Sequence, residues 1–177
     1  MKSLLEIYNQ DTSPDAHGDK GTAHSYIEHY YENAFKPYRD KDITLLEIGI
    51  AQGQSLRMWR EYFSPDSRII GYDIRDNNVD CPGCELVYKD ATNSNSFNEI
   101  NELDIVIDDG SHLFGQQLQS FNILFDKLKS GGLYVIEDVQ EIDAVKEQFL
   151  SLNPNVQIFD FRSIKNRKDD IIIQILK

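Results

Sequence analysis

The sequence lacks any long apolar run. No stretch of its 177 residues approaches the roughly 20 consecutive apolar residues that are needed to cross a bilayer. The first residues, Met1 to Glu6, also lack the long apolar core of a secretory signal peptide. We therefore expect a protein that makes no membrane contact and resides in the cytoplasm.

Positive charge is also scarce. The chain has 18 Lys and Arg residues against 30 Asp and Glu residues, which leaves a net charge of -12. Proteins whose affinity comes from neutralising phosphates need an excess of Lys and Arg, so nucleic acid is not an expected partner. The length and the 40% share of hydrophobic residues suit a single domain with one core.

Cysteine is limited to Cys81 and Cys84, which form a C-x-x-C motif around a Pro-Gly pair. A structural zinc site needs four ligands, and the chain has no second cysteine pair. A thioredoxin-like motif would open a helix after the first strand, whereas Pro-Gly favours a turn. We interpret the two cysteines as reduced thiols in a loop, with a redox or zinc site as the alternative.

What the sequence does contain is an alternation of short apolar stretches and segments of helical length. The predicted strands are Thr44–Ile48, Ile69–Ile74, Glu85–Lys89, Asp104–Ile107, Leu133–Glu137, Val156–Phe161 and Ile171–Leu176. The predicted helices are Ser55–Phe63, Ser94–Glu102, Phe114–Leu128, stopped by the glycines at 131 and 132, and Glu141–Leu152. This alternation predicts a Rossmann-like, doubly wound α/β fold: a mostly parallel seven-stranded sheet with helices on both faces and a C-terminal antiparallel hairpin.

The first 40 residues differ in character from the rest of the domain. Residues 11–22 are rich in Asp, Gly, Ser and Thr and predict a loop, whereas residues 23–38 carry aromatic and apolar side chains at helical spacing. We expect residues 1–40 to cover the mouth of the active site and residues 41–177 to form the core. Exposed Tyr30 and Tyr31 would close the pocket or join a homo-oligomer.

The glycine turn after the first strand is the feature that predicts a ligand. Gly49 and Gly53 interrupt the chain between that strand and a helix, and Asp73 ends the next strand about 20 residues further on. The glycines let the backbone approach a nucleoside, and Asp73 can accept both ribose hydroxyls. Glu47 places a carboxylate where a dinucleotide-binding turn would present a pyrophosphate, so the site suits a cationic ligand.

Acids end the remaining parallel strands as well. Asp90 follows the third strand, where it can accept a hydrogen bond from the amino group of an adenine. Asp109 follows the fourth strand, and Glu137 and Asp138 follow the fifth. Each acid taken alone could instead be a helix cap or a loop residue. Because the carboxyl ends of parallel strands meet in one crevice, these charges would repel one another without cations.

We infer two cations from this crowding. One is a sulfonium ligand near Glu47 and Asp73. The other is a divalent metal near Asp109, Glu137 and Asp138, and oxygen ligands of this kind suit Mg²⁺ or Mn²⁺ better than zinc.

His112 stands close to these acids in the sequence, four residues after Asp108. A histidine near neutrality can remove a proton from a hydroxyl that a metal has already made more acidic. His112 is therefore our candidate catalytic base. A hydrogen-bonded cap of the following helix, or a further metal ligand, remains an open alternative for this residue.

Several motifs together resemble class I S-adenosylmethionine-dependent methyltransferases. More narrowly, they resemble the metal-dependent sugar O-methyltransferases of macrocin and mycinamicin type and their cephalosporin-hydroxylase-like relatives. The motifs are Leu46-Glu47-Ile48-Gly49, Ser55-Leu56-Arg57-Met58-Trp59, Asp108-Asp109-Gly110-Ser111-His112 and Gly131-Gly132-Leu133-Tyr134-Val135-Ile136-Glu137-Asp138. The early Asp19-Lys20-Gly21, with His24 and Tyr30, resembles a segment of that family that approaches the active site.

The resemblance implies methyl transfer from S-adenosylmethionine to a hydroxyl of a small molecule such as a sugar. It matches Asp108 to a cofactor-binding position, Asp109, Glu137 and Asp138 to the metal ligands, and His112 to the general base.

Two alternative functions stay open at the level of the sequence. An NAD-dependent oxidoreductase would use the same turn, but Ala51 stands where its second glycine belongs and Glu47 would oppose the pyrophosphate. The other alternative is a methyltransferase-like domain that binds the nucleoside without catalysis.

Overall fold

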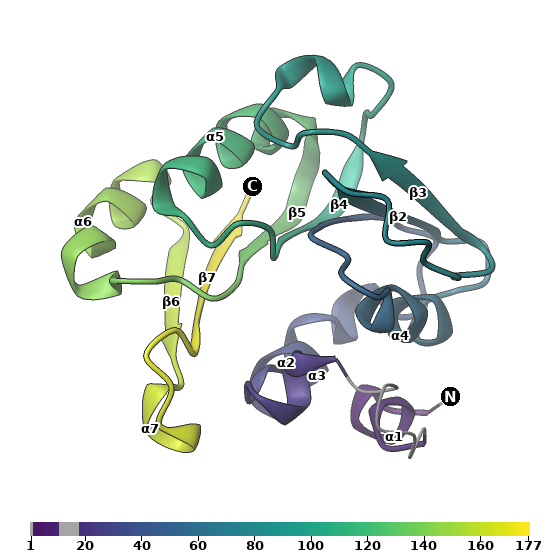
Figure 1. The fold of residues 1–177 in the computed structure, drawn as a ribbon, viewed down its shortest axis with the longest axis horizontal. Coiled ribbons are helices and arrows are strands. Elements are labelled where there is room, and N and C mark those ends of the chain that lie inside the picture. The colour runs from purple at the N-terminus through teal and green to yellow at the C-terminus, as the bar shows by residue number, and fades with distance from the viewer. Residues whose placement is uncertain (1, 11–17) are drawn as a thin grey trace.

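One mixed sheet forms the centre of the structure, with strands in the order β3-β2-β1-β4-β5-β7-β6 (Figure 1). The computed structural model describes residues 2–10 and 18–177. The strands are β1 Thr44–Ile48, β2 Arg68–Asp73, β3 Cys84–Tyr88, β4 Leu103–Asp108, β5 Leu128–Ile136, β6 Val156–Asp160 and β7 Ile171–Leu176. Strands β1 to β5 pair in parallel, whereas β7 is antiparallel to both β5 and β6. The predicted sheet and its C-terminal hairpin are therefore confirmed.

Helices cover both faces of this sheet (Figure 1). The α-helices are α1 Leu4–Tyr8, α2 Asp19–Thr22, α3 Glu32–Ala34, α4 Gln54–Tyr62, α5 Phe114–Leu124, α6 Ile142–Leu152 and α7 Arg162–Lys165. A π-helix, η1, spans Ile27–Tyr31, and the 3-10 turns are η2 Lys36–Tyr38, η3 Ser94–Phe97 and η4 Phe125–Lys127. Among the described residues, no helix is long and apolar enough to cross a membrane.

The two faces of the sheet bury separate apolar clusters. Successive strand residues point to opposite faces, so Leu45 packs with α4 and the N-terminal helices while Leu46 packs with α5 and α6. Glu47 follows the parity of Leu45 and therefore faces the N-terminal segment. Tyr30 and Tyr31 are buried in this first cluster, with 3% and 0% of their surface exposed. The expectation of exposed tyrosines at these positions was wrong, because the Tyr31 ring packs against Trp59 of α4 and the Tyr30 ring packs against Phe159 of β6.

Two predicted helices are shorter than expected. The segment from Ser94 to Glu102 forms only the turn η3, where the Asn93 side chain accepts from Asn95 N–H; short polar side chains of this kind compete for backbone groups and weaken helices. Helix α5 ends at Leu124, and β5 already begins at Leu128, so the glycine pair lies within the strand rather than at a helix stop. Part of the predicted N-terminal loop, residues 11–17, lies outside the described residues.

The cysteine pair is a second correction. Cys81 and Cys84 are joined by a disulfide, not present as two thiols. The predicted turn at Pro82 and Gly83 is confirmed: Gly83 has a φ of 82°, and Cys84 N–H donates to Cys81 O at 3.0 Å. This turn brings the two side chains to the same side of the loop that enters β3.

Candidate active site

The turn after β1 lies in close contact with the loop after β4. Gly49 has a φ of 81°, a left-handed conformation that favours glycine. A Cβ atom at this position would lie 2.0 Å from the carbonyl oxygen of Asp109. Asp73, at the end of β2, supports the turn because its Oδ2 accepts from Ile50 N–H at 3.1 Å. The predicted glycine turn is therefore a site of close backbone approach.

A cavity of about 190 Å³ opens beside this turn, between the ends of β1, β2, β3 and β4. Four of the predicted cofactor-binding residues line it: Gly49, Asp73, Asp90 and Asp108. A second cavity, of about 260 Å³, lies toward the N-terminal segment and is lined by Lys20, Gly49 and Asp109 among others. The two cavities share Gly49, so the turn separates one from the other.

Glu47 and Gly53 are the predicted cofactor-binding residues that do not line the 190 Å³ cavity. Gly53 caps the start of α4 with a φ of 76°, and a Cβ there would lie 2.3 Å from Val79 Cγ1. Glu47 is fully buried, and its Oε2 accepts from Ser55 Oγ at 2.9 Å and from Trp59 Nε1 at 3.0 Å. Burial raises the pKa of Glu47 to about 7.

The two acids at the far wall of the cavity differ in environment. Asp90 is exposed and accepts from the N–H and hydroxyl of Thr92, which keep the pKa of Asp90 below its ordinary value. Asp108 is 2% exposed, and burial raises its pKa to about 7. Its Oδ2 is buried and has no hydrogen-bond partner among the described residues. A buried acceptor without a donor at a cavity wall fits a bound ligand that donates a hydrogen bond.

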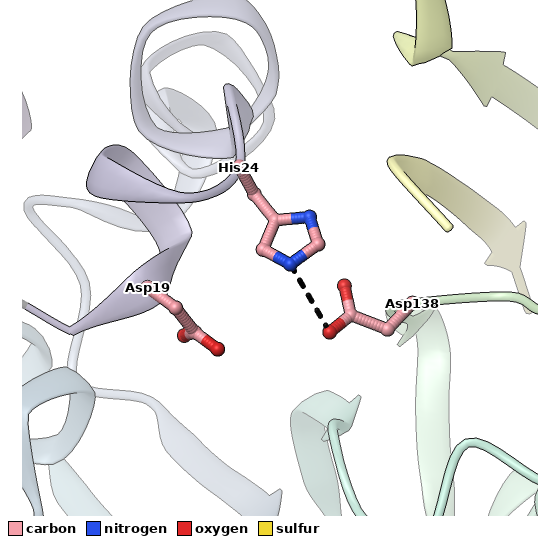
Figure 2. Close-up of side chains that lie close together, drawn as sticks. All are labelled: Asp19, His24 and Asp138. Atoms are coloured by element: carbon pink, nitrogen blue, oxygen red, sulfur yellow. Dashed lines mark ion pairs between the residues drawn. The ribbon is translucent and has the colours of Figure 1, made fainter. Parts of the chain in front are cut away.

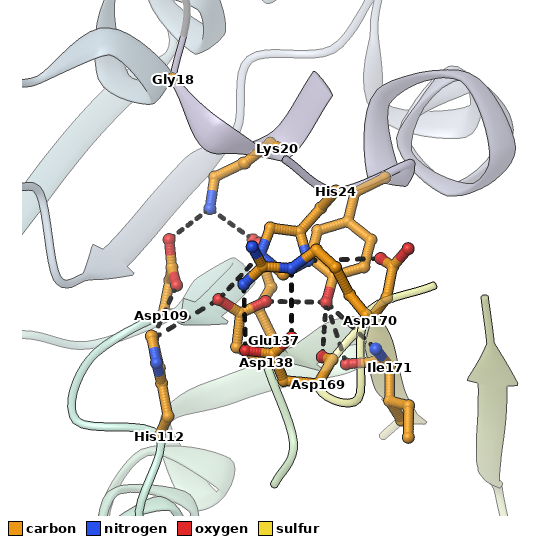
Figure 3. A network of polar contacts seen from close by, with 12 residues as sticks. Gly18, Lys20, His24, Asp109, His112, Glu137, Asp138, Asp169, Asp170 and Ile171 are labelled. Atoms are coloured by element: carbon orange, nitrogen blue, oxygen red, sulfur yellow. Dashed lines mark hydrogen bonds and ion pairs between the residues drawn. The ribbon is translucent and has the colours of Figure 1, made fainter. Parts of the chain in front are cut away.

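Lys20 reaches from α2 into the cluster of carboxylates at the ends of β4 and β5 (Figure 3). Its Nζ lies 2.5 Å from Asp109 Oδ2 and 2.7 Å from Glu137 Oε1, and 3.5 Å from Glu47 Oε1. Burial alone would lower the pKa of Lys20, but these three carboxylates raise it well above its ordinary value. The protonated Lys20 side chain therefore places a positive charge inside the cluster.

Two tyrosines of the same N-terminal segment also bind these carboxylates. The Tyr31 hydroxyl donates to Glu137 Oε1. The Tyr26 hydroxyl donates to Asp138 Oδ1 at 2.7 Å and accepts from Ile171 N–H at 3.1 Å. The segment therefore orients both acids that follow β5.

His112 faces the same acids from the loop before α5. Its Nε2 lies 3.1 Å from Asp109 Oδ1 and 3.9 Å from Asp138 Oδ2. The hydrogen bond with Asp109 raises the pKa of His112 above its ordinary value. Both His112 and Asp138 have left-handed backbones, with φ of 57° and 52°. Such strain in residues other than glycine concentrates at functional sites.

His24 also approaches Asp138 (Figure 2). Its Nε2 lies 3.4 Å from Asp138 Oδ2, and its Nδ1 lies 3.3 Å from Asp170 Oδ1. Figure 2 shows the Asp19 carboxylate directed toward the same gap. Asp138 is thus shared between two histidines.

The donor atoms of this cluster fit a divalent cation. Asp109, His112 and Asp138 offer ligand atoms within 4.8 Å of one another. Glu47, Asp109 and Glu137 form an adjoining set of the same size, and Lys20 lies within it. A third set, Asp19, His24 and Asp138, shares Asp138 with the first, so the predicted metal ligands are divided over three neighbouring sets. Carboxylate oxygens are the donors that Mg²⁺ and Mn²⁺ prefer.

Sequence reasoning did not assign a role to Lys20, and it did not identify Tyr26 or Trp59 as part of this network. Lys20 lies 117 positions from Glu137, so no spacing rule connects them. The available signal was the resemblance of Asp19-Lys20-Gly21 to a segment that approaches the active site in related enzymes.

Known proteins resemble the chain over this core. No family model matches it. The 8-demethyl-8-alpha-L-rhamnosyl tetracenomycin-C 2'-O-methyltransferase of Streptomyces olivaceus is 40% identical over 137 residues, which cover 70% of this chain and 36% of the relative. Mycinamicin VI 2''-O-methyltransferase of Micromonospora griseorubida is 37% identical over 131 residues, which cover 67% of this chain and 32% of the relative. The chain thus spans about a third of the length of the curated relatives it matches.

A solved structure extends the likeness to nearly every residue. The MycE methyltransferase of the mycinamycin biosynthetic pathway, in complex with Mg, SAH (S-adenosylhomocysteine) and mycinamycin VI, has a TM-score of 0.76 and 25% identity. The match covers 99% of this chain and 53% of that one. The fold of the chain agrees with that of this solved structure. The chain therefore has the Rossmann-like fold of the class I S-adenosylmethionine-dependent methyltransferases and is similar to sugar O-methyltransferases of the macrocin and mycinamicin type.

Proposed function

We propose that the chain transfers a methyl group from S-adenosylmethionine to a hydroxyl of a small molecule, such as a sugar, with the assistance of Mg²⁺ or Mn²⁺. The observation that carries the proposal is that Asp109, His112 and Asp138 offer ligand atoms within 4.8 Å of one another, next to a cavity lined by Gly49 and Asp108. The names of the curated relatives support a sugar as the acceptor.

One group of residues would bind the cofactor and a second group would bind the metal. Gly49, Asp73, Asp90 and Asp108 would bind the cofactor at the 190 Å³ cavity. Glu47, which lies outside that cavity, would add negative charge near the sulfonium, and Gly53 would shape the turn. Asp109, Glu137 and Asp138 would hold the metal, with His112 at its edge. When bound, the metal supplies positive charge that makes a coordinated hydroxyl more acidic.

His112 would then receive the hydroxyl proton on Nδ1, because Nε2 donates to the Asp109 carboxylate. Its side chain is 29% exposed, whereas that of Asp138 is 6% exposed, so His112 is the more open of the two toward a substrate. Asp109 orients the ring through the 3.1 Å contact and stabilises the imidazolium that forms. Orientation of the acceptor oxygen toward the methyl group is the other contribution of the protein.

The N-terminal segment completes the proposal. Residues 1–40 would cover the mouth of the site over the core of residues 41–177, and the contacts of Lys20, Tyr26 and Tyr31 with strand-end acids support this role. A cytoplasmic location, the absence of nucleic-acid binding and a homo-oligomer stay predictions from the sequence.

Ligand-induced melting tests the cofactor. SAH is expected to raise the melting temperature through mass action, whereas NAD⁺ leaves it unchanged. Stabilisation by NAD⁺ and not by SAH would favour the oxidoreductase alternative. SAH binding without methyl transfer to any sugar, catechol or other diol would favour a binding domain without catalysis.

A further inference from the structure

The connection between β6 and β7 carries basic side chains that the proposed function does not use: Arg162, Lys165, Arg167 and Lys168. Two of them pair with acids close to them in the sequence. Arg162 Nη2 lies 2.7 Å from Asp160 Oδ2, and Arg167 Nη2 lies 3.1 Å from Asp169 Oδ2. Lys165, at the end of α7, instead binds the N-terminal segment.

Lys165 contacts the C-terminal end of α2. Its Nζ donates to the carbonyl oxygens of Gly21 at 2.7 Å, Thr22 at 3.0 Å and His24 at 2.5 Å. These three acceptors match the three N–H donors of an ammonium. A lysine at the last carbonyls of a helix forms charge-assisted hydrogen bonds there. The contact therefore joins α7 to α2 across 144 positions of sequence in the case of Gly21.

Helix α2 is too short to keep its position without such contacts. It has four residues, Asp19–Thr22, and no side chain caps its N-terminus. The hydrogen bond from His24 N–H to Asp19 O, at 2.8 Å, closes its last turn. Isolated helices of much greater length are marginal in water, so the position of α2 depends on the elements that surround it.

Two side chains of the carboxylate site extend from this short segment (Figure 3). Lys20 Nζ lies 2.7 Å from Glu137 Oε1, and His24 Nε2 lies 3.4 Å from Asp138 Oδ2. The carbonyls that Lys165 binds belong to the backbone between Lys20 and His24 and to His24 itself. Lys165 therefore fixes the backbone from which both side chains reach the acids.

Helix α7 provides a fixed support for Lys165. Phe161 N–H donates to Asp170 O at 2.8 Å, directly beyond the last paired residues of β6 and β7. Ile164 N–H donates to Phe161 O at 2.9 Å. The backbone that carries Lys165 is thus held to the edge of the sheet.

We infer that Lys165 is a positioning residue that holds α2 over the carboxylate site, so that Lys20 and His24 reach the acids after β4 and β5. It acts through the backbone of α2 and, within the described chain, forms no ion pair with these acids. The effect of Lys165 on the position of α2 is independent of the proposed function. Its importance for methyl transfer rests on that function.

Hydrogen exchange of the full chain, measured by mass spectrometry, tests this inference with Lys165→Met. The substitution keeps the length of the side chain and removes all three donors, and the exposed position leaves the core untouched. Exchange in the peptide of residues 18–25 is expected to become about tenfold faster, because hydrogen bonds from a charged group are lost. Exchange in β1 and β4 should stay as in the wild type.

The Lys20 ammonium supplies a second reading of the same opening. Its protons are buried among carboxylates and should exchange slowly enough with water to be observed by nitrogen-15 nuclear magnetic resonance. In Lys165→Met this exchange is expected to accelerate together with that of the peptide. An unchanged rate for both would overturn the inference.

Two further variants serve as controls. Lys165→Arg keeps the charge and the donors and is expected to restore the wild-type exchange of residues 18–25. Lys168→Met removes the same charge from an exposed position on the same connection and should leave this exchange unchanged. Equal acceleration in Lys165→Met and Lys168→Met would show an effect of net charge and would contradict the inference, as would a failure of Lys165→Arg to restore the wild-type rate.

The remaining outcomes separate a local role from a global one and from the proposed function. Acceleration throughout the sheet, with a lower melting temperature, would make Lys165 a general stabilising residue and reject the assignment. The dissociation constant for SAH, measured by calorimetry, should stay within about twofold in Lys165→Met, because residues 18–25 do not line the 190 Å³ cavity. Loss of SAH binding in this variant alone would also reject it. Absence of SAH binding in the wild type would count against the proposed function, while the exchange rates would still decide the role of Lys165.

Discussion

At the scale of single residues, Gly49 lies at the boundary between the two cavities. The residue lines both of them, and its backbone conformation and its contact with Asp109 each require the absence of a side chain. The sequence motif predicts the turn, but it does not reveal which backbone the turn approaches.

Gly49→Ala is expected to destabilise the protein by about 2–4 kcal/mol, because the new Cβ meets a carbonyl oxygen and the left-handed backbone adds strain. SAH binding should be lost with it. Thermal melting with and without SAH measures both effects. The control is Gly115→Ala in α5, where a Cβ would meet no atom within 4 Å and a gain of about 0.5–1 kcal/mol is expected. Equal behaviour of the two variants would contradict this account.

His112 is the residue on which the proposed proton transfer depends. His112→Ala is expected to lower the rate of methyl transfer by roughly 10²- to 10⁴-fold. The dissociation constant for SAH should stay within about twofold, since His112 does not line the 190 Å³ cavity. Steady-state kinetics and calorimetry separate the two effects.

His29→Ala serves as the control for this prediction. The His29 side chain is 40% exposed and contacts Glu28 and Phe161 rather than the acidic cluster. Its methyl-transfer rate should equal that of the wild type. Unchanged turnover in His112→Ala would remove the assigned role as base.

At the scale of elements, the N-terminal segment is joined to the sheet by tyrosine hydroxyls. Tyr26 bridges the end of β5 and the start of β7, because its hydroxyl binds both Asp138 and Ile171 N–H. The Tyr31 ring packs against Trp59 of α4, with ring centroids 5.1 Å apart. Helical spacing predicts the aromatic stripe of this segment. It does not predict that the tyrosine hydroxyls bind acids at the ends of the strands.

Tyr26→Phe is expected to cost about 1–3 kcal/mol, since it removes the hydroxyl that donates to a buried oxygen of Asp138. Chemical denaturation measures the difference. Tyr38→Phe is the matched control: the Tyr38 hydroxyl donates to Gly131 O at 2.9 Å in an exposed contact, and its loss should cost less than about 1 kcal/mol. A larger loss for Tyr38→Phe than for Tyr26→Phe would contradict the anchoring role.

At the scale of the whole molecule, a chain with a net charge of -12 places several of its acids together in a largely buried cluster. Glu47, Asp109, Glu137 and Asp138 lie together at the carboxyl edge of the sheet, and burial raises the pKa of Glu47, Glu137 and Asp138. Lys20 neutralises part of this charge. The remaining acids favour a further cation.

Addition of Mg²⁺ is therefore expected to raise the melting temperature, and EDTA should reverse the effect. At a concentration about 100 times the dissociation constant, mass action contributes about 2.7 kcal/mol. Asp109→Ala should abolish the response, whereas the exposed Asp66→Asn should retain it. Scanning calorimetry over a Mg²⁺ series provides the measurement. An equal response in Asp109→Ala would place the ion elsewhere.

The sequence by itself determined the βα alternation, the glycine turn and the acids at the strand ends. These features depend on residues close together in the chain and on the rule that parallel strands end at one edge of their sheet. The same local reasoning overextended the helix from Ser94, where polar side chains cap a short turn instead.

Only the tertiary structure decided which groups meet. Lys20 contacts Glu137 across 117 positions of sequence, and Tyr26 contacts Asp138 across 112. Tyr31 is buried in the core. Glu47 lies outside the cofactor cavity, on the sheet face that the N-terminal segment covers. The physical reason is that hydrophobic burial of α1 and η1 in the cluster that includes α4 sets the position of this segment. Spacing along a chain carries no information on contacts that such packing creates.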